Sequence, residues 1–323
     1  MVRRLIHWAL AASVLATSAT HAQTAASYPS KTVRIVVPYP AGGPVDAAAR
    51  QVARGLAEQF GQAVVVDNKP GASSSLGAAE VAKSAADGHT LLFTLPDSFT
   101  YLPRLFKNLP YDPLKDFAPI TQVASTPPVL VLRNDAGVAS IKDLGPKSPP
   151  ISFGTWGSGT YPHLIAAALA QKTRANMTIV GYRGGAPAVQ DFMGGHIQMT
   201  IAGVPAALDI QAKGLGKIVA VGGGQRSAAL PDVPTYAELG FTEGTFSVPS
   251  WVALAAPAGT PVEVVNKVRD GVVKVLAEKP MQDFLARFGW SAMGNTPAQF
   301  KAALERETPL IAEAMRTAGV QAE

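Results

Sequence analysis

The chain has 323 residues, carries a formal net charge of +5 at neutral pH and contains no cysteine. Without cysteine, neither a disulfide framework nor a thiolate metal site can form. The basic residues are scattered instead of forming a run or a stripe interleaved with aromatic residues, which argues against a nucleic-acid partner.

The first 22 residues have the order of a secretory signal peptide. Arg3 and Arg4 precede an apolar run over residues 5–15, and small residues then lead to Ala22. A membrane anchor is the alternative, but this run is shorter than the roughly 20 apolar residues that span a bilayer. We therefore expect cleavage after Ala22, a Gram-negative periplasmic location, and a mature chain long enough for two domains.

Predicted strands and helices alternate in the first part of the mature chain, which indicates βαβ units and a parallel sheet. The predicted order is strand 32–37, helix 45–60, strand 63–67, helix 76–86 and strand 90–95. The alternation then stops, because residues 101–113 are rich in Pro, Asn and Asp. Residues 117–132 are predicted to be extended, since Pro127 and Pro128 exclude a continuous helix.

A second alternating block follows. Its predicted strands are 151–155, 177–182, 197–201 and 218–221, and its helices are 162–172, 187–193 and 205–213. Residues 246–255 are again predicted to be extended, and helices 261–276, 281–288 and 297–316 end the chain.

Because the chain passes between the two blocks twice, one domain is inserted into the other. We expect lobe 1 to comprise residues 23–124 plus 251–323, and lobe 2 to comprise residues 125–250. Such an arrangement is typical of a two-lobed hinge protein that binds its ligand between the lobes.

The two blocks share one short pattern. Tyr39-Pro-Ala-Gly-Gly-Pro-Val-Asp46 and the segment from Tyr182 to Asp191 each have a strand-ending Tyr, a Gly-Gly turn, an early helical Pro and then an acid. Ordinary turn chemistry explains such a pattern, because Gly suits the turn and Pro the first helical positions. The alternative is a pair of facing anion cradles, one in each lobe.

The sequence motifs fit neither a phosphate-binding site nor a catalytic site well. The Gly-Gly turn lacks both G-x-G-x-x-G and the Gly-Lys-Ser/Thr ending of a phosphate loop, and no His or carboxylate cluster has metal-ligand spacing. Ser158 lies outside a G-x-S-x-G elbow, because Trp156 and Thr160 stand where glycine is required. His163 is the available base, although a packing or ligand-contacting histidine is the more common role.

Gly-rich polar loops at the predicted strand ends supply hydroxyl and amide groups, with Arg183 as an exception. In an open α/β sheet the ligand lies beyond the carboxyl ends of the strands, and N–H and O–H donors there suit a small anion. Trp156, Trp251, Phe99 and Tyr101 could stack on a ring, although core or hinge packing is the commoner role. We expect no cofactor and no metal.

The candidate ligand-binding residues come from these loops. They are Tyr39, Pro40, Ala41, Gly42, Gly43, Ser74, Ser75, Asp97, Thr155, Trp156, Gly157, Ser158, Thr160, His163, Tyr182, Arg183, Gly184 and Gly203.

A series of motifs in order resembles the substrate-binding proteins of tripartite tricarboxylate transporters, the Bordetella uptake gene (Bug) group. The matching motifs are Tyr28-Pro-Ser-Lys31, Val37-Pro-Tyr-Pro-Ala-Gly-Gly43, Asp67-Asn-Lys-Pro-Gly71, Asp87-Gly-His-Thr-Leu91, Leu109-Pro-Tyr-Asp-Pro113, Gly157-Ser-Gly159, Tyr182-Arg-Gly-Gly185, Leu230-Pro-Asp-Val-Pro-Thr235 and Pro257-Ala-Gly-Thr-Pro261. The resemblance implies an α/β, two-lobed periplasmic binding protein of the Venus flytrap type, with parallel-rich sheets and two extended hinge crossovers.

The resemblance also implies a function. It implies a receptor, not an enzyme, that closes on a small carboxylate and delivers it to integral-membrane transporter components. In the family the first-lobe Gly-Gly loop holds a carboxylate, partly through ordered water, and this role carries over to residues 40–43. The opposite lobe would contribute residues 155–160 and 182–185. We expect a monomer.

Two departures from the family pattern bear on the ligand. After Gly71 the family usually continues Ala-Gly-Gly-Asn/Ser, whereas here Ala72-Ser-Ser-Ser75 has hydroxyls in place of the glycines. The run Met199-Thr-Ile-Ala-Gly203 lacks the acid that often ends this strand, which argues against an ammonium-bearing ligand. Trp156 in the Gly-rich loop favours an aromatic carboxylate, with a dicarboxylate as the other possibility. A ligand-sensing partner of a two-component sensor and a periplasmic hydrolase using Ser158 and His163 remain alternatives.

Overall fold

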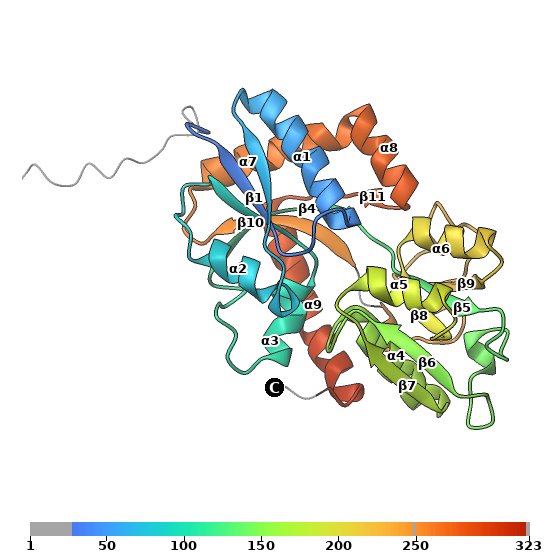
Figure 1. The fold of residues 1–323 in the computed structure, drawn as a ribbon. Coiled ribbons are helices and arrows are strands. Elements are labelled where there is room, and N and C mark those ends of the chain that lie inside the picture. The colour runs from blue at the N-terminus through green and yellow to red at the C-terminus, as the bar shows by residue number, and fades with distance from the viewer. Residues whose placement is uncertain (1–27, 248–249, 321–323) are drawn as a thin grey trace, which may run out of the picture.

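The computed structural model describes residues 28–247 and 250–320, so the predicted signal peptide lies outside the described residues. Figure 1 shows two lobes side by side, each built on a sheet with helices packed against it. The predicted two-lobed α/β architecture is confirmed.

The first sheet has six strands in the order β11-β4-β10-β3-β1-β2. They are β1 (Val33–Val37), β2 (Val64–Asn68), β3 (Thr90–Thr94), β4 (Phe117–Ser125), β10 (Trp251–Pro257) and β11 (Ser291–Ala292). β1 pairs in parallel with β2 and β3, whereas β10 pairs antiparallel with β3 and β4. This sheet is therefore mixed, because the strand that returns from the other lobe enters it in the opposite direction.

Helices cover both faces of this sheet. One face packs against α1 (Pro44–Phe60), α7 (Val262–Ala277) and α8 (Lys279–Phe288), whose buried Val and Leu side chains meet those of β1. The other face packs against α2 (Ser75–Ala82) and the first half of α9 (Pro297–Thr317). The apolar stripe of α1, with buried Val52 and Leu56, is the amphipathic face that its sequence predicts.

The second sheet has five strands in the order β7-β6-β8-β5-β9. They are β5 (Val129–Arg133), β6 (Ile151–Thr155), β7 (Met177–Gly181), β8 (Met199–Ala202) and β9 (Gly216–Val221). β6 is parallel to β7 and β8, and β5 is antiparallel to β8 and β9. Helix α4 (Tyr161–Thr173) packs on one face, and α5 (Gly185–Met193) and α6 (Val204–Ala212) pack on the other.

The chain crosses between the sheets after β4 and again before β10. At these crossings the backbone N–H of Thr126 donates to the carbonyl of Ser250 at 2.9 Å, and the two hydroxyls lie 2.7 Å apart. The prediction that residues 246–255 are extended is wrong at its start, because Gly244–Ser247 forms a 3-10 helix. Phe246 packs against Tyr236 and Phe241, which requires the chain to curl before it crosses.

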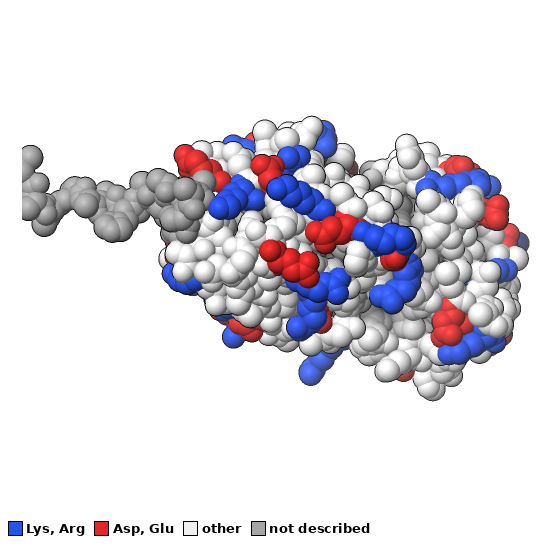
Figure 2. Space-filling view, turned by 90° about the horizontal axis from the view of Figure 1, so that it is seen from above, with Lys and Arg blue, Asp and Glu red and all other residues white. Residues whose placement is uncertain are grey.

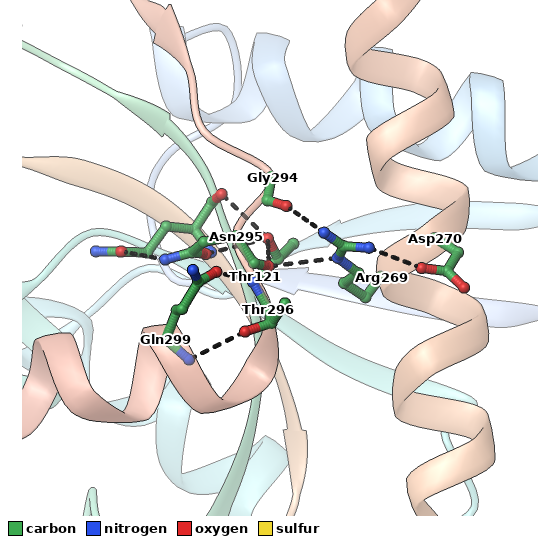
Figure 3. Close-up of polar contacts among 8 residues, drawn as sticks. Thr121, Arg269, Asp270, Gly294, Asn295, Thr296 and Gln299 are labelled. Atoms are coloured by element: carbon green, nitrogen blue, oxygen red, sulfur yellow. Dashed lines mark hydrogen bonds and ion pairs between the residues drawn. The ribbon is translucent and has the colours of Figure 1, made fainter.

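Helix α9 is a third connection between the lobes. Its start is held in lobe 1, where Asn295 accepts from the backbone of Gln122 and donates to that side chain, both at 2.8 Å (Figure 3). Arg269 donates to the carbonyl of Gly294 at 2.8 Å in the same network. The far end of α9 contributes Ile311, Ala314 and Met315 to the core that α3 (Leu102–Leu105) shares with the strands and α4 of lobe 2.

Two other predictions differ in detail from the structure. No helix was predicted between β3 and residue 113, but Asp97–Tyr101 forms a π-helix and Leu102–Leu105 a short helix, α3. Helix α2 ends at Ala82 instead of continuing to residue 86.

Candidate functional site

The predicted site residues lie in what we call the strand-end loops, residues 39–44, 71–75, 94–98, 155–160, 182–185 and 202–204. β1 lies next to β2 and β3, so the carboxyl ends of these strands carry the three loops of lobe 1 side by side. β6 lies between β7 and β8, which groups the three loops of lobe 2 in the same way. Both groups therefore lie at carboxyl ends of strands, where open α/β sheets bind ligands.

A contact between the lobes lies beside these loops. An ideal Cβ built on Gly159 would lie 2.1 Å from Cδ1 of Leu105, so the lobe 2 loop lies directly against α3 of lobe 1. Gly159 also has φ +69°, a conformation that glycine adopts without strain. Gly159 lies in the loop 155–160 that the resemblance assigned to the site, but Leu105 was not predicted, because no local pattern shows that α3 reaches the other lobe.

A chain of buried hydroxyls connects the lobe 1 loops. The phenol of Tyr39 lies 3.1 Å from the hydroxyl of Thr94, which lies 2.7 Å from that of Ser98. Ser98 in turn lies 3.1 Å from the hydroxyl of Ser74. Ser75 is also buried, at the first position of α2. These side chains hold the loops against one another.

The Gly-Gly turn is held by Asp46, the acid in the first turn of α1. Its carboxylate accepts from the backbone N–H of Gly42 at 2.9 Å and from Arg50 and Asn68 at 3.0 Å. Burial by itself raises the pKa of Asp46, but these hydrogen bonds outweigh it and hold the pKa below its usual value.

The hydrogen bond to Asp46 corrects one expectation. The N–H of Gly42 was expected to receive a ligand carboxylate, but in the structure it already donates to Asp46. The N–H groups of Gly43 and Val45, at the cap and second position of α1, donate no bond within the described residues. Pro40 and Ala41 are exposed beside them.

Asp97 begins the segment after β3. Its carboxyl is half-buried and forms no hydrogen bond or ion pair among the residues that the structure describes. Burial raises its pKa to about 7. Tyr39, Tyr101 and Tyr111 are close enough for the negative charge of Asp97 to contribute to their own raised pKa values.

The loop before α2 holds an unusual backbone. Ala72, Ser73 and Ser74 have φ values of 44°, 53° and 82°, in the left-handed region that favours glycine. Two of these positions are those where the resemblance led us to expect glycine. The serines therefore keep the glycine-type backbone at a cost in strain.

In lobe 2 the indole of Trp156 is half-buried and donates to the carbonyl of Ile201 at 3.2 Å. An ideal Cβ on Gly185 would lie 3.1 Å from its ring nitrogen, so the indole lies over this turn. Thr155 is buried at the end of β6, and Gly157 and Thr160 are half-buried, with the Thr160 hydroxyl donating to the Gly157 carbonyl at 2.9 Å. Trp156 can present only part of its ring to a ligand.

Ser158 and His163 do not form a nucleophile–base pair. Nδ1 of His163 accepts from the backbone N–H of Gly159 at 2.7 Å, and Ser158 is exposed without a hydrogen bond to this imidazole. Burial lowers the pKa of His163, which favours the neutral ring that this bond requires. His163 therefore holds the loop and is not placed to act as a base for Ser158.

The Gly-Gly turn of lobe 2 differs from its counterpart in lobe 1. The phenol of Tyr182 donates to Asp191 at 2.6 Å, so this acid holds the tyrosine and not a loop amide. Gly184, with φ 115°, caps α5, and Gly203 is exposed at the cap of α6. Arg183 is exposed and has no ion pair among residues 28–247 and 250–320.

Two of the aromatic candidates pack in the core. Phe99 and Trp251 are 1% exposed and lie with their ring centroids 6.3 Å apart, each also against Phe300 of α9. Both therefore hold the region where β10 and α9 meet and cannot stack on a ligand. Tyr101, 2% exposed, joins the core that spans both lobes.

Metal-ligand clusters, membrane-spanning helices, surface charge and surface hollows indicate no second functional site in the described part of the chain. It holds no group of three or more His, Asp or Glu fit for a metal ion, and none of its helices is long and apolar enough to cross a bilayer. Basic and acidic side chains are mixed over the face shown in Figure 2. Two surface hollows, one lined by Val138 and Pro149 and one by Phe60 and Lys267, contain none of the predicted site residues.

Comparisons with known proteins agree with this geometry. Residues 48–314 match the model of the tripartite tricarboxylate transporter family receptor. The chain is 36% identical over 315 residues to a protein encoded in the tcbD-tcbE intergenic region of Pseudomonas sp. (strain P51), covering 94% of this chain and 92% of that protein. It is 32% identical to BugT of Bordetella pertussis, covering 92% of each chain.

Two solved structures are similar to this chain along nearly their whole length. A protein of R. palustris with adipate has a TM-score of 0.83 and 30% identity, covering 92% of this chain and all of that one. MatC from Rhodopseudomonas palustris with bound malate has a TM-score of 0.76 and 26% identity, covering 89% and 99%. The chain belongs to the tripartite tricarboxylate transporter receptor family, whose members are solute receptors and not enzymes.

Proposed function

We propose that this protein binds a small organic carboxylate between its lobes in the periplasm, and delivers it to the integral-membrane components of a tripartite tricarboxylate-type transporter. Closure of the lobes would enclose the ligand, and the protein would act as a monomer. The predicted division into lobe 1 (residues 23–124 plus 251–323) and lobe 2 (residues 125–250) is part of this proposal.

The observation that carries the proposal is the set of helix starts at the strand-end loops. Helices α1, α4, α5 and α6 begin at the caps Gly43, Thr160, Gly184 and Gly203. Unpaired N–H groups and the helix dipole make each start favourable for an anion. Arg183 is the only cationic side chain in these loops. Neutral donors of this kind suit reversible capture of a carboxylate better than a permanent ion pair.

The ligand-binding residues that we propose are those predicted from the sequence, with one change of role. Gly43 and Val45, and not Gly42, would donate to the carboxylate from lobe 1, because Asp46 occupies the Gly42 amide. Trp156 would lie beside the ligand, and Thr160 and Arg183 would close over it from lobe 2. Ser158 is exposed on the same loop and would contribute a hydroxyl.

The ligand class follows from these groups. The partly exposed indole of Trp156 supports an aromatic carboxylate, and the solved relatives with adipate and malate support a dicarboxylate. Both classes share the carboxylate that the helix starts would receive. Neither requires an ammonium site, which fits the missing acid between Met199 and Gly203.

Calorimetric titration of the purified mature protein with terephthalate, benzoate, adipate, malate and glutamate tests the proposal. We expect binding of terephthalate or of an aliphatic dicarboxylate, and a Trp156→Ala variant that loses more affinity for terephthalate than for adipate. Tight binding of glutamate with no binding of the other four would overturn the proposed ligand class. Absence of binding by all five would contradict the proposed carboxylate function.

A further inference from the structure

The proposed site contains one acid, Asp97, that pairs with no side chain or backbone group of the described residues. Asp97 lies in the strand-end loop that follows β3, and its carboxyl has no hydrogen bond among the described residues. The neighbouring hydroxyls of Thr94, Ser98 and Ser74 bond to one another and not to this group. The carboxyl oxygens of Asp97 are not among the fully buried polar atoms without a partner, so this half-buried group keeps a solvent-facing side that a ligand can reach.

The surroundings of Asp97 disfavour its negative charge. Facing groups are Tyr39 from the loop after β1, Tyr101 from its own segment, and Tyr111 from the chain after α3. All three have raised pKa values, chiefly because they are buried, and so stay neutral.

The charged groups on the adjoining helices do not offset the effect of burial on the pKa of Asp97. Glu307 of α9 is another acid near Tyr101, while Arg104 of α3 and Arg306 of α9 form no ion pair with Asp97. Among the residues that the structure describes, no hydrogen bond or ion pair stabilises the carboxylate of Asp97, and burial favours the neutral acid, with a pKa of about 7.

A second unpartnered group lies on the opposite lobe. Tyr161 begins α4, is 5% exposed, and its phenol has no hydrogen-bond partner within the described residues. It lies close enough to Tyr101 for the two phenols to influence each other electrostatically. Tyr101 therefore lies near Asp97 of lobe 1 on one side and near an unpartnered phenol of lobe 2 on the other.

We propose that Asp97 recognises the ligand as a neutral acid, donating a hydrogen bond to a carboxylate of the ligand, so that binding takes up one proton. This inference rests on the proposed carboxylate function. A ligand carboxylate can only accept hydrogen bonds, and a neutral Asp97 supplies a donor that an ionised one lacks. Two carboxyl groups in one dry site share a proton because both cannot ionise cheaply. Asp97 would thereby select acids over amines.

The test is calorimetry with adipate and terephthalate at pH 6, 7 and 8, in buffers of different ionisation enthalpy, which counts the protons taken up. With a pKa of about 7, Asp97 changes from mostly neutral to mostly ionised across this range. We expect affinity to fall about tenfold from pH 6 to pH 8, with nearly one proton taken up at pH 8.

Two variants sharpen the result. Asp97→Asn keeps a hydrogen-bond donor but cannot titrate, so we expect binding to persist without pH dependence or proton uptake. Asp283→Asn removes an exposed acid on α8 and should leave the pH dependence unchanged.

Three outcomes would overturn the inference. The first is pH-independent binding by the unmodified protein, and the second is a pH dependence that persists in Asp97→Asn. The third is tighter binding of glutamate with rising pH, lost in Asp97→Asn, which would mean that an ionised Asp97 accepts from an ammonium group. Each of these leaves carboxylate binding itself intact. Absence of binding by either probe at every pH would instead remove the proposed function and this inference together.

Discussion

The carboxylate of Asp46 accepts a 2.9 Å hydrogen bond from the backbone N–H of Gly42, four residues earlier in the chain. Arg50 and Asn68 complete the shell around this buried acid. The Gly-Gly turn therefore has its conformation before any ligand binds. The backbone N–H groups of Gly43 and Val45 remain available to donate to the ligand.

Replacing Asp46 with Ala should loosen this turn. Three hydrogen-bond donors would lose their acceptor, so we expect the free energy of unfolding to fall by about 1–3 kcal/mol. Affinity for the ligand should fall at least several-fold, because the turn is no longer preorganised. Urea unfolding and calorimetric titration measure the two effects.

The matched control is Asp191→Ala in lobe 2, which removes an acceptor from the Tyr182 phenol but from no loop amide. It should weaken binding less than Asp46→Ala does. Equal losses of affinity in the two variants would show that the Gly42 contact has no special role.

Gly159→Ala should disfavour the arrangement of the lobes that the structure shows. The added Cβ would lie 2.1–2.5 Å from three atoms of Leu105, and φ +69° adds strain. We expect weaker ligand binding and a larger radius of gyration by solution X-ray scattering. Leu105→Ala in the same chain should restore part of the affinity, because it removes the clash. If Leu105→Ala restores no affinity, the whole effect of Gly159→Ala comes from backbone strain at residue 159 and not from the clash with Leu105.

Glu307→Gln should change how stability depends on pH. Glu307 is buried in α9, accepts from the indole N–H of Trp251 at 2.9 Å, and has a pKa raised to about 7 by burial. Its ordinary value is 4.5, so between pH 4.5 and 7 the folded state holds more protons than the unfolded state. The free energy of unfolding therefore falls as pH rises through this window, by on the order of 2–3 kcal/mol.

The glutamine variant can still accept from the indole but cannot ionise. The difference in unfolding free energy between the variant and the unmodified protein should therefore favour the variant more at pH 8 than at pH 5. Urea unfolding at the two pH values measures this difference. Glu313→Gln, an exposed acid on the same helix, is the control and should show a small difference. A Glu307→Gln effect of equal size at both pH values would contradict the burial argument.

Ser73→Gly should stabilise the protein. Ser73 is exposed and holds φ 53° and ψ 39°, which costs a non-glycine residue about 1 kcal/mol. Ser73→Ala is the control, because it removes the hydroxyl but keeps the steric cost. Thermal unfolding should show a gain for the glycine variant and none for the alanine variant. Equal stability of both variants would mean that the loop carries no strain at this position.

Sequence periodicity was enough to predict most of the elements. β6 was predicted at its observed bounds, and α1 and α9 within one residue of theirs. These elements are defined by neighbours in the chain: apolar spacing, β-branched runs, and Pro or Gly at the ends. Where a distant partner decides the backbone, prediction was wrong, as at Gly244–Ser247, which curls because Phe246 packs on Tyr236 and Phe241.

The sequence by itself determined that polar, Gly-rich loops follow the strands and that helices start beside them, because these are local properties. Only the tertiary structure decided what each polar group does. Asp46 binds the Gly42 amide, and His163 holds Gly159. Asp97 has no hydrogen-bond partner in residues 28–247 and 250–320 and lies near the buried phenols of Tyr39, Tyr101 and Tyr111. The partner of a hydrogen-bonding atom depends on which distant segments the sheet order brings together, and no local pattern records that order.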